Sequence, residues 1–118
     1  MRRVSAYVST ILILIAAPAH AAQSTPLAIT ELLTKTYIAS ARCSFLPSND
    51  ERELAGYFLH AKRAAAEIAG APLAEMALER GRSSGEVAPC SSITRQEVLS
   101  TLVAARRAMM ASTAVEQN

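Results

Sequence analysis

The sequence predicts an all-α fold: a small bundle-like domain of four helices, three long and one short, with one disulfide, after an N-terminal signal peptide. Apolar residues recur at three- and four-residue spacing along most of residues 26–110. Helix start and stop signals separate these stretches. Runs of β-branched residues and hairpin dipeptides such as Asn-Gly are missing after residue 21. The length of 118 residues allows one domain, which we expect to span residues 22–118.

Residues 1–21 have the features of a cleavable secretory signal peptide. Two arginines follow the first residue, and residues 4–17 are apolar and uncharged. This apolar segment is shorter than the roughly 20 residues that span a bilayer, although an uncleaved anchor remains the alternative. An Ala-His-Ala sequence then ends at Ala21, and signal peptidase requires such small residues. We therefore expect cleavage between Ala21 and Ala22.

Export changes the interpretation of charge. Arg2 and Arg3 account for the whole excess of 12 basic over 10 acidic residues, so the mature chain is neutral. A neutral chain gives no indication of binding to nucleic acid or to anionic membranes. We expect neither nucleic-acid binding nor stable membrane insertion after processing. The expected location is the periplasm or the exterior of the cell.

Cys43 and Cys90 are the two cysteines of the chain. An even number of cysteines in an oxidising compartment favours a disulfide, with two free thiols as the alternative. By loop closure such a bridge would stabilise the fold by roughly 4 kcal/mol. A redox role is not expected, because the chain has no Cys-x-x-Cys motif and no residue near either cysteine except Arg42 would lower a thiol pKa. Two cysteines and one histidine also cannot complete a four-ligand zinc site.

The first helix is expected to follow Thr25-Pro26 and to end between Cys43 and Phe45, before Pro47. Proline suits the first helical position because its missing N–H would have no partner there. The predicted apolar face recurs at helical spacing. It consists of Ile29, Leu32, Leu33, Thr36, Tyr37, Ser40 and Ala41.

The second helix is expected to begin at a capping box, in which Ser48 caps the N–H of Glu51 and Glu51 reaches back. Its apolar positions alternate between spacings of three and four, which is typical of an amphipathic helix. They are Leu54, Tyr57, Phe58, Ala61, Ala65 and Ile68. Gly70 is expected to end this helix, and Pro72 prevents its continuation.

The third helix is expected to be short, from Leu73 to Arg80, with Gly81 as its stop. Residues 81–89 contain glycine and serine and predict a loop. The fourth helix is expected to start at a second capping box of Thr94 and Glu97.

A hydrophobic staple between Ile93 and Val98 is expected to support the start of the fourth helix. Its last residues, 112–118, are expected to fray. Short connections favour antiparallel neighbours. In an up-down-up-down order, the end of the first helix and the start of the fourth meet, which brings Cys43 and Cys90 together.

A few residues suggest chemistry. His60 lies near the edge of an apolar stripe and close in sequence to Glu53, and a carboxylate–histidine pair can act as a base or hold a metal. The more ordinary interpretation is a boundary histidine. Met76, Met109 and Met110 are candidates for a soft-metal site, but we expect them to fill gaps in the core.

Four arginines are candidates for an anion-binding patch, although solvated helix faces are the default interpretation. They are Arg80, Arg82, Arg106 and Arg107. The sequence contains no hydrolase, haem, phosphate-loop or calcium-loop motif. We therefore expect no cofactor and assign no catalytic residue, and an enzyme is the less favoured class.

In outline the chain is similar to the acid-stress chaperones of the bacterial periplasm. The resemblance lies in the signal peptide, the short helical mature chain and the two cysteines, and it implies a chaperone-like role. The alanine-rich composition also predicts a thin core near the stability threshold, which suits a protein that repacks on a partner. We expect a non-enzymatic periplasmic binding or stress protein with a protein partner. The alternative is a helical protein that binds a small ligand or a metal.

Overall fold

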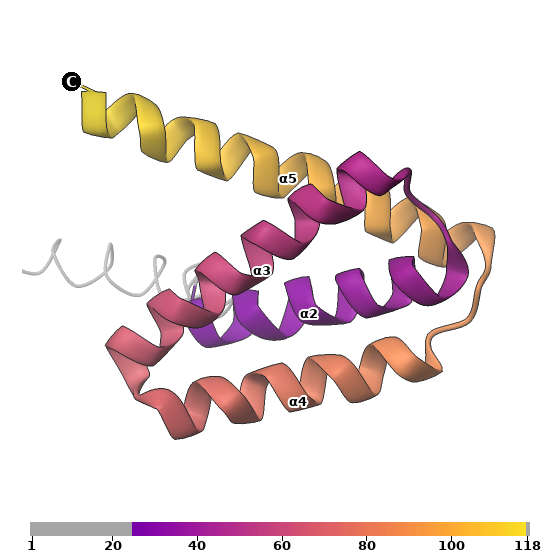
Figure 1. Cartoon of the computed structure of the whole chain (residues 1–118), viewed down its shortest axis with the longest axis horizontal. Coiled ribbons are helices and arrows are strands. Elements are labelled where there is room, and N and C mark those ends of the chain that lie inside the picture. The colour runs from indigo at the N-terminus through magenta and orange to yellow at the C-terminus, as the bar shows by residue number, and fades with distance from the viewer. Residues whose placement is uncertain (1–24, 118) are drawn as a thin grey trace, which may run out of the picture.

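The computed structural model describes residues 25–117, and the side chains of residues 25–111. Over this range the chain is helical and has no strand, which confirms the all-α prediction (Figure 1). The helices are α2 (Pro26–Cys43), α3 (Ser48–Ala69), α4 (Ala71–Val87) and α5 (Ser92–Gln117). The predicted signal peptide, residues 1–21, and its cleavage site lie outside the described residues.

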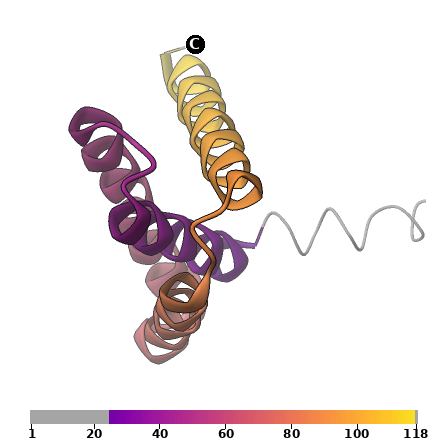
Figure 2. The ribbon, with the colours of Figure 1, turned by 90° about the vertical axis from the view of Figure 1, so that its right-hand side faces the viewer.

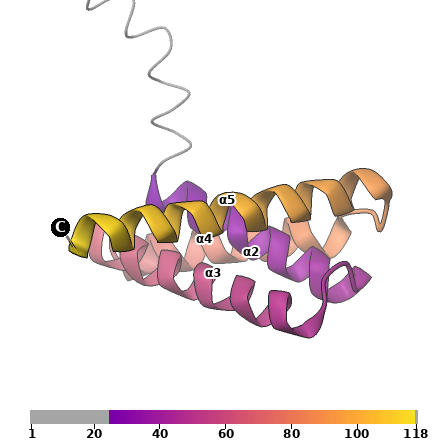
Figure 3. The same cartoon turned by 90° about the horizontal axis from the view of Figure 1, so that it is seen from above.

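The four helices run alternately in opposite directions, as the short connections predicted (Figure 1). Helix α2 lies in the middle, and each of the other three packs against it (Figure 2). Helix α4 has the most extensive contact with α2, whereas α5 crosses over α2 and has the least (Figure 3). Within residues 25–117, no helix has both the length and the apolarity that crossing a membrane requires. The bundle is thus organised around one central helix.

The start and end of α2 agree with the sequence-based prediction. The side chain of Thr25 accepts a hydrogen bond from the N–H of Ala28 at 3.2 Å, and Pro26 is the first helical residue. Ser44 adopts a left-handed conformation with φ 55°, and the N–H of Phe45 donates to the carbonyl of Ser40. This ending exposes fewer unpaired carbonyls at the end of the helix.

The predicted capping box of α3 is wrong. Ser48 is already the first helical residue, and Pro47 stands at the cap position without a side-chain hydrogen bond. The N–H of Glu51 donates to the backbone carbonyl of Pro47 at 3.0 Å, so the backbone replaces the predicted serine hydroxyl. The end of α3 is as predicted: Gly70 follows it with φ 99°, a conformation that favours glycine.

The predicted start of α5 is also wrong, because the helix begins at Ser92. The hydroxyl of Ser91 accepts from the N–H of Thr94 at 3.2 Å and takes the capping role that was predicted for Thr94. Ile93 is 72% exposed, whereas Val98 belongs to the core, so the predicted staple has no buried partner on the side of Ile93. The helical backbone continues to Gln117.

Helix α4 differs most from the prediction, because it is long and contains Gly81, which was expected to end it, and Gly85, which was expected to lie in a loop. Gly81 and Gly85 lie inside the helix and are buried. A Cβ atom on Gly81 would lie 2.5 Å from the carbonyl oxygen of Glu31, and one on Gly85 would lie 2.7 Å from Cβ of Ile38. Glycine is therefore required here because the backbone of α4 touches α2, and the predicted 81–89 loop does not form.

Other small residues extend this contact between α2 and α4. Ala74 and Ala77 continue the row of glycines along α4 and are fully buried. The facing side chains of α2 include Thr30 and Thr34, whose hydroxyls donate to carbonyls of α2 itself at 2.8 and 2.7 Å. Because those hydroxyls are satisfied within their own helix, they can be buried without partners on α4.

The hydrophobic core lies between α2, α3 and α5. Its buried members are Leu33, Leu46, Leu54, Ala61, Val98 and Leu102. Aromatic side chains enclose this cluster, and the rings of Tyr37 and Phe58 lie 5.1 Å apart between centroids. The core is small, in agreement with the alanine-rich composition.

A disulfide joins Cys43, at the end of α2, to Cys90, just before α5, with the Cα atoms 5.4 Å apart. This confirms the predicted bridge and the shared end of the two helices. The neighbouring Arg42 donates to the carbonyls of Gly85, at 3.3 Å, and Ala88. Arg42 thereby satisfies carbonyls that the end of α4 leaves without helical partners.

Candidate functional site

Helix α5 is attached along a narrow line. Val98 and Leu102 reach the core, and Arg106 pairs with α3. A groove remains on each side of this line, because the flanking side chains of α5 are mostly small or polar. These two grooves differ in the polarity of their lining.

The first is named here the alanine groove and has a volume of about 370 Å³. It lies among the first half of α2, the second half of α3 and the second half of α5, where Figure 1 shows α3 and α5 diverging. Its lining includes Pro26, Ile29, Leu32 and Leu33 of α2, with Tyr57, His60, Ala61 and Ala64 of α3. Helix α5 contributes Thr101, Ala104, Ala105, Ala108 and Met109.

The alanine groove is open because of the size of its wall residues. Ala64 on α3 and both Ala104 and Ala108 on α5 line it, and an alanine side chain extends only one methyl group from the backbone. A longer side chain at these positions would fill the space. The resulting surface is almost entirely apolar, which is typical of sites that bind apolar molecules or apolar segments of proteins.

The groove brings together two of the residues singled out in the sequence. His60, on α3, and Met109, on α5, both line it. Met76 and Met110 lie elsewhere and are 53% and 70% exposed, so the prediction that they fill the core is wrong for these two. Both lie on the outer surface of their helices. A three-methionine site is therefore not assembled.

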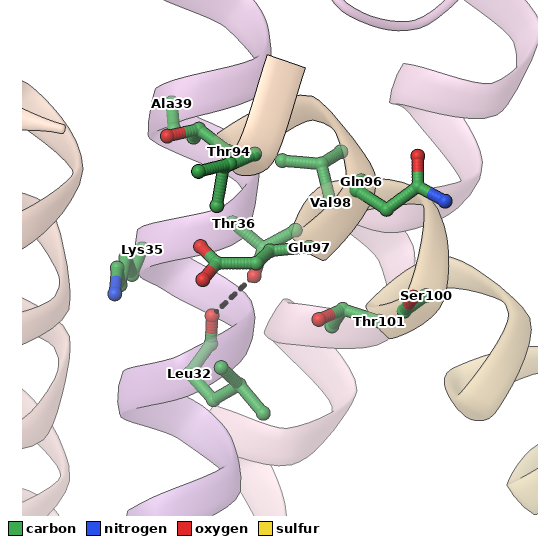
Figure 4. Close-up of a pocket in the computed structure, with 11 residues that line it drawn as sticks. Leu32, Lys35, Thr36, Ala39, Thr94, Gln96, Glu97, Val98, Ser100 and Thr101 are labelled. Carbon is green, nitrogen blue, oxygen red and sulfur yellow. Dashed lines mark hydrogen bonds between the residues drawn. The ribbon is translucent and has the colours of Figure 1, made fainter. Parts of the chain in front are cut away.

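The second groove, named here the polar groove, lies on the other side of α5 and has a volume of about 540 Å³ (Figure 4). Polar side chains of α5 line it, and the carboxylate of Glu97 extends toward α2, whereas the side chain of Gln96 points away from α2. The hydroxyl of Thr36 points into this region but donates to the carbonyl of Leu32 at 2.8 Å. Its mixed lining offers less apolar surface to a ligand than the alanine groove does.

A polar cluster holds α5 against α3 beside the alanine groove. Arg106 donates to both carboxylate oxygens of Glu53, at 2.8 and 2.9 Å, and to Asp50 at 3.1 Å. Tyr57 donates its hydroxyl hydrogen to the same Glu53. A two-point arginine–carboxylate contact of this kind fixes orientation as well as charge.

This cluster changes the acidity of its members. The hydrogen bonds from Arg106 and then from Tyr57 lower the pKa of Glu53 from 4.5 to about 2. Burial, together with the hydrogen bond to Glu53, raises the pKa of Tyr57. The bonded Glu53 carboxylate raises the pKa of Arg106 above its usual value. The three groups thus stay in one charge state from mildly acidic to mildly basic pH, which suits a structural clamp better than proton transfer.

The suggested carboxylate–histidine pair is not the arrangement found, because Glu53 is engaged by Arg106 and Tyr57. The suggested arginine patch is also not formed. Arg80 pairs with Glu31 of α2, and Arg82 pairs with Glu79 of its own helix, each at 2.9 Å. Three of the four candidate arginines, counting Arg106, are therefore neutralised by carboxylates.

The alanines of the groove were not predicted from the sequence. The available signal was the set Ala104, Ala105 and Ala108, which recurs at helical spacing beside Met109. Among residues 25–111 there is no group of three or more histidine, cysteine or acidic side chains that could hold a metal ion. Comparisons with protein families, with curated proteins and with solved structures found no match to this chain.

Proposed function

We propose that this protein is an exported, non-enzymatic binding protein, and that its alanine groove holds an apolar helical segment of another exported protein. The observation that carries the proposal is the groove itself: an open apolar surface bounded by two diverging helices. Burying such a surface against a partner is favourable at about 25 cal/mol per Å² of apolar area.

The extent of the apolar surface favours a helix over a small molecule. Ile68 lies one helical turn beyond Ala64 on α3 and is 72% exposed. Leu32 on the floor of the groove is about half exposed. The apolar surface therefore continues past the cavity along α3. An amphipathic helix that lays its apolar face into a groove uses a surface of this shape.

The charge around the groove also describes the partner. Among its lining residues, His60 is the one with a basic side chain, and the hydroxyl of Tyr57 is bonded to Glu53. The bound face of the partner is therefore expected to be uncharged, with an acidic residue tolerated only near His60. This differs from a chaperone that recognises strongly charged clients.

The test uses Ala104→Arg, which places a charge on the groove wall, and Ser83→Arg as the matched control on the exposed surface of α4. Isothermal titration with a synthetic amphipathic helix, whose apolar face consists of leucine and alanine, is expected to show binding to the unmodified chain and to Ser83→Arg. We expect Ala104→Arg to lose at least tenfold in affinity. Equal affinity for all three proteins, or no binding to any, would contradict the proposal.

A small apolar ligand is the second candidate, because about 370 Å³ is within the size range of small-molecule sites. His60 and Met109 would also suit a soft metal ion at the edge of the groove. Thermal-shift measurements with long-chain fatty acids, haem, zinc and copper test this candidate. A ligand specific for the folded state must raise the melting temperature, and Ala104→Arg must remove that increase.

A further inference from the structure

We propose that the Cys43–Cys90 disulfide is a thiol-exchange site, at which an external thiol attacks Cys43 and Cys90 leaves as a thiolate stabilised by Arg42. The proposal goes beyond the proposed binding function and does not depend on it. It rests on the surroundings of the two sulfur atoms, at the end of the molecule that faces the viewer in Figure 2.

The two sulfurs have different surroundings. Cys90 is exposed and Cys43 is half-buried, so access by itself does not favour attack at Cys43, and the selection rests on the charge beside Cys90. Nη1 of Arg42 lies 3.7 Å from Sγ of Cys90. A guanidinium at this distance favours a thiolate over a thiol, so it lowers the pKa that Cys90 has once it is released. A thiol of lower pKa is the better leaving group in disulfide exchange.

Arg42 is already fixed in place for this role. Its Nη2 donates to the carbonyls of Gly85 and Ala88 at the end of α4, which holds the guanidinium beside Cys90. Helix α5 begins at Ser92, so its N-terminal N–H groups add positive potential near the same sulfur. The helix end alone would be a weak effect, and the direct contact with Arg42 carries the inference.

The reaction is an ordinary thiol–disulfide exchange with a dithiol reductant. A thiolate of the reductant attacks Sγ of Cys43, a mixed disulfide forms, and the electron pair of the broken S–S bond leaves with Cys90. The second thiol of the reductant then attacks the reductant sulfur that is bonded to Cys43, and Cys43 is released as a thiolate. The reductant becomes a disulfide, and two electrons and two protons have passed to the protein. Exchange disconnects the end of α2 from the segment that leads into α5.

The direct test maps the mixed disulfide in the unmodified, oxidised chain. The protein is mixed with reduced glutathione, and the reaction is quenched early with iodoacetamide, before a second glutathione attacks the mixed disulfide. Peptide mass spectrometry is expected to find glutathione on Cys43 and the alkyl group on Cys90, with at least a threefold excess over the reverse pattern. Equal amounts of the two patterns, or an excess of glutathione on Cys90, would overturn the proposal.

A variant tests the part played by Arg42. Arg42→Gln removes the charge but keeps an amide donor for the carbonyls of α4, and Arg95→Gln removes a charge from the first turn of α5 as the control. We expect the initial rate of glutathione exchange to fall about threefold in Arg42→Gln, and a fall of this size corresponds to a change of about one unit in the pKa of a thiol. In Arg95→Gln the rate should stay unchanged. An unchanged rate in a folded Arg42→Gln would contradict the role of Arg42. The mapping of the unmodified chain decides the proposal if this variant does not fold.

Discussion

Helices α4 and α5 both present small residues to α2, with opposite results. Along α4, glycines and alanines let two backbones touch, so that even one added methyl group at Gly81 meets Glu31 and Thr34. Along α5, alanines face a space of about 370 Å³. The difference lies in what holds each helix at its distance from α2.

At the α4 interface the buried residues of α4 are glycines and alanines, and the threonines of α2 bury their hydroxyls within their own helix. At α5, the larger Val98 and Leu102 set the separation, and the alanines beside them do not reach across. Small residues therefore close an interface or open a groove according to the largest side chain between the helices. In this molecule the closed interface supports the fold, and the open one provides the candidate site.

Among the changes considered, reduction of the disulfide is expected to have the largest effect on the free energy of unfolding. Cys43–Cys90 closes a loop over a sequence separation of 47 residues, and losing such a constraint costs roughly 4 kcal/mol in unfolding free energy. Urea unfolding with and without reductant measures this. If α5 of the reduced protein loses helical order at a lower urea concentration than α4, the result would support the weaker attachment of α5. An unchanged midpoint would show that the bridge contributes nothing to stability.

Substitution of Gly81 and of Gly56 by alanine should change the stability of the protein in opposite directions. Gly81→Ala gains about 1 kcal/mol in helix propensity, but the added Cβ would lie 2.5 Å from a backbone oxygen, so we expect a net loss of about 2 kcal/mol. Gly56→Ala is the control, because a Cβ there has nothing within 4 Å, and it should gain up to about 1 kcal/mol. Chemical denaturation of both variants measures the difference. Stabilisation by Gly81→Ala would contradict the close contact between the backbone of α4 and α2.

The clamp between Glu53 and Arg106 predicts a pH dependence. Because folding lowers the pKa of Glu53 from 4.5 to about 2, its contribution is complete above pH 4.5 and is lost as the pH falls toward 2. Partial exposure of both side chains limits this contribution to about 1 kcal/mol. Glu53→Gln should be less stable than the unmodified chain at pH 7, and the two stabilities should converge near pH 2. A constant gap across this range would show that Glu53 does not titrate with the fold.

Filling the alanine groove should have the smallest effect on stability. Ala64→Leu adds apolar area where the groove has space, so we expect a gain of about 0.5 kcal/mol and weaker binding of an apolar helix. Ser83→Leu, on the exposed surface of α4, should leave both quantities unchanged. A large loss of stability in Ala64→Leu would mean that the groove is already closed in solution.

Local sequence signals correctly predicted those helix ends that are determined by residues close in sequence. Thr25-Pro26 and Gly70 were assigned correctly as a helix start and a helix stop, and the two cysteines were correctly predicted to form a disulfide. The signals failed where a distant helix decides. Gly81 resembles a stop signal in the sequence, but its place inside α4 depends on the backbone of α2.

The start of α5 was predicted incorrectly for a different reason. Ser91, Ser92 and Thr94 are all good cap residues, so the sequence could not identify which one caps the helix. The alanine groove could not be predicted either, because it depends on the distance at which Leu102 holds α5 from α2. His60 and Met109 were identified as notable residues, but only the fold brings them to one surface.

Native-state hydrogen exchange tests most directly the claim that α4 is closely packed on α2 while α5 is loosely attached. With the disulfide intact, amides in the middle of α2 and α4 should exchange only through global unfolding. Those of α5 after Arg106 should exchange at least tenfold faster, through local opening. Equal protection of α4 and of this part of α5, or earlier opening of α4, would contradict the account.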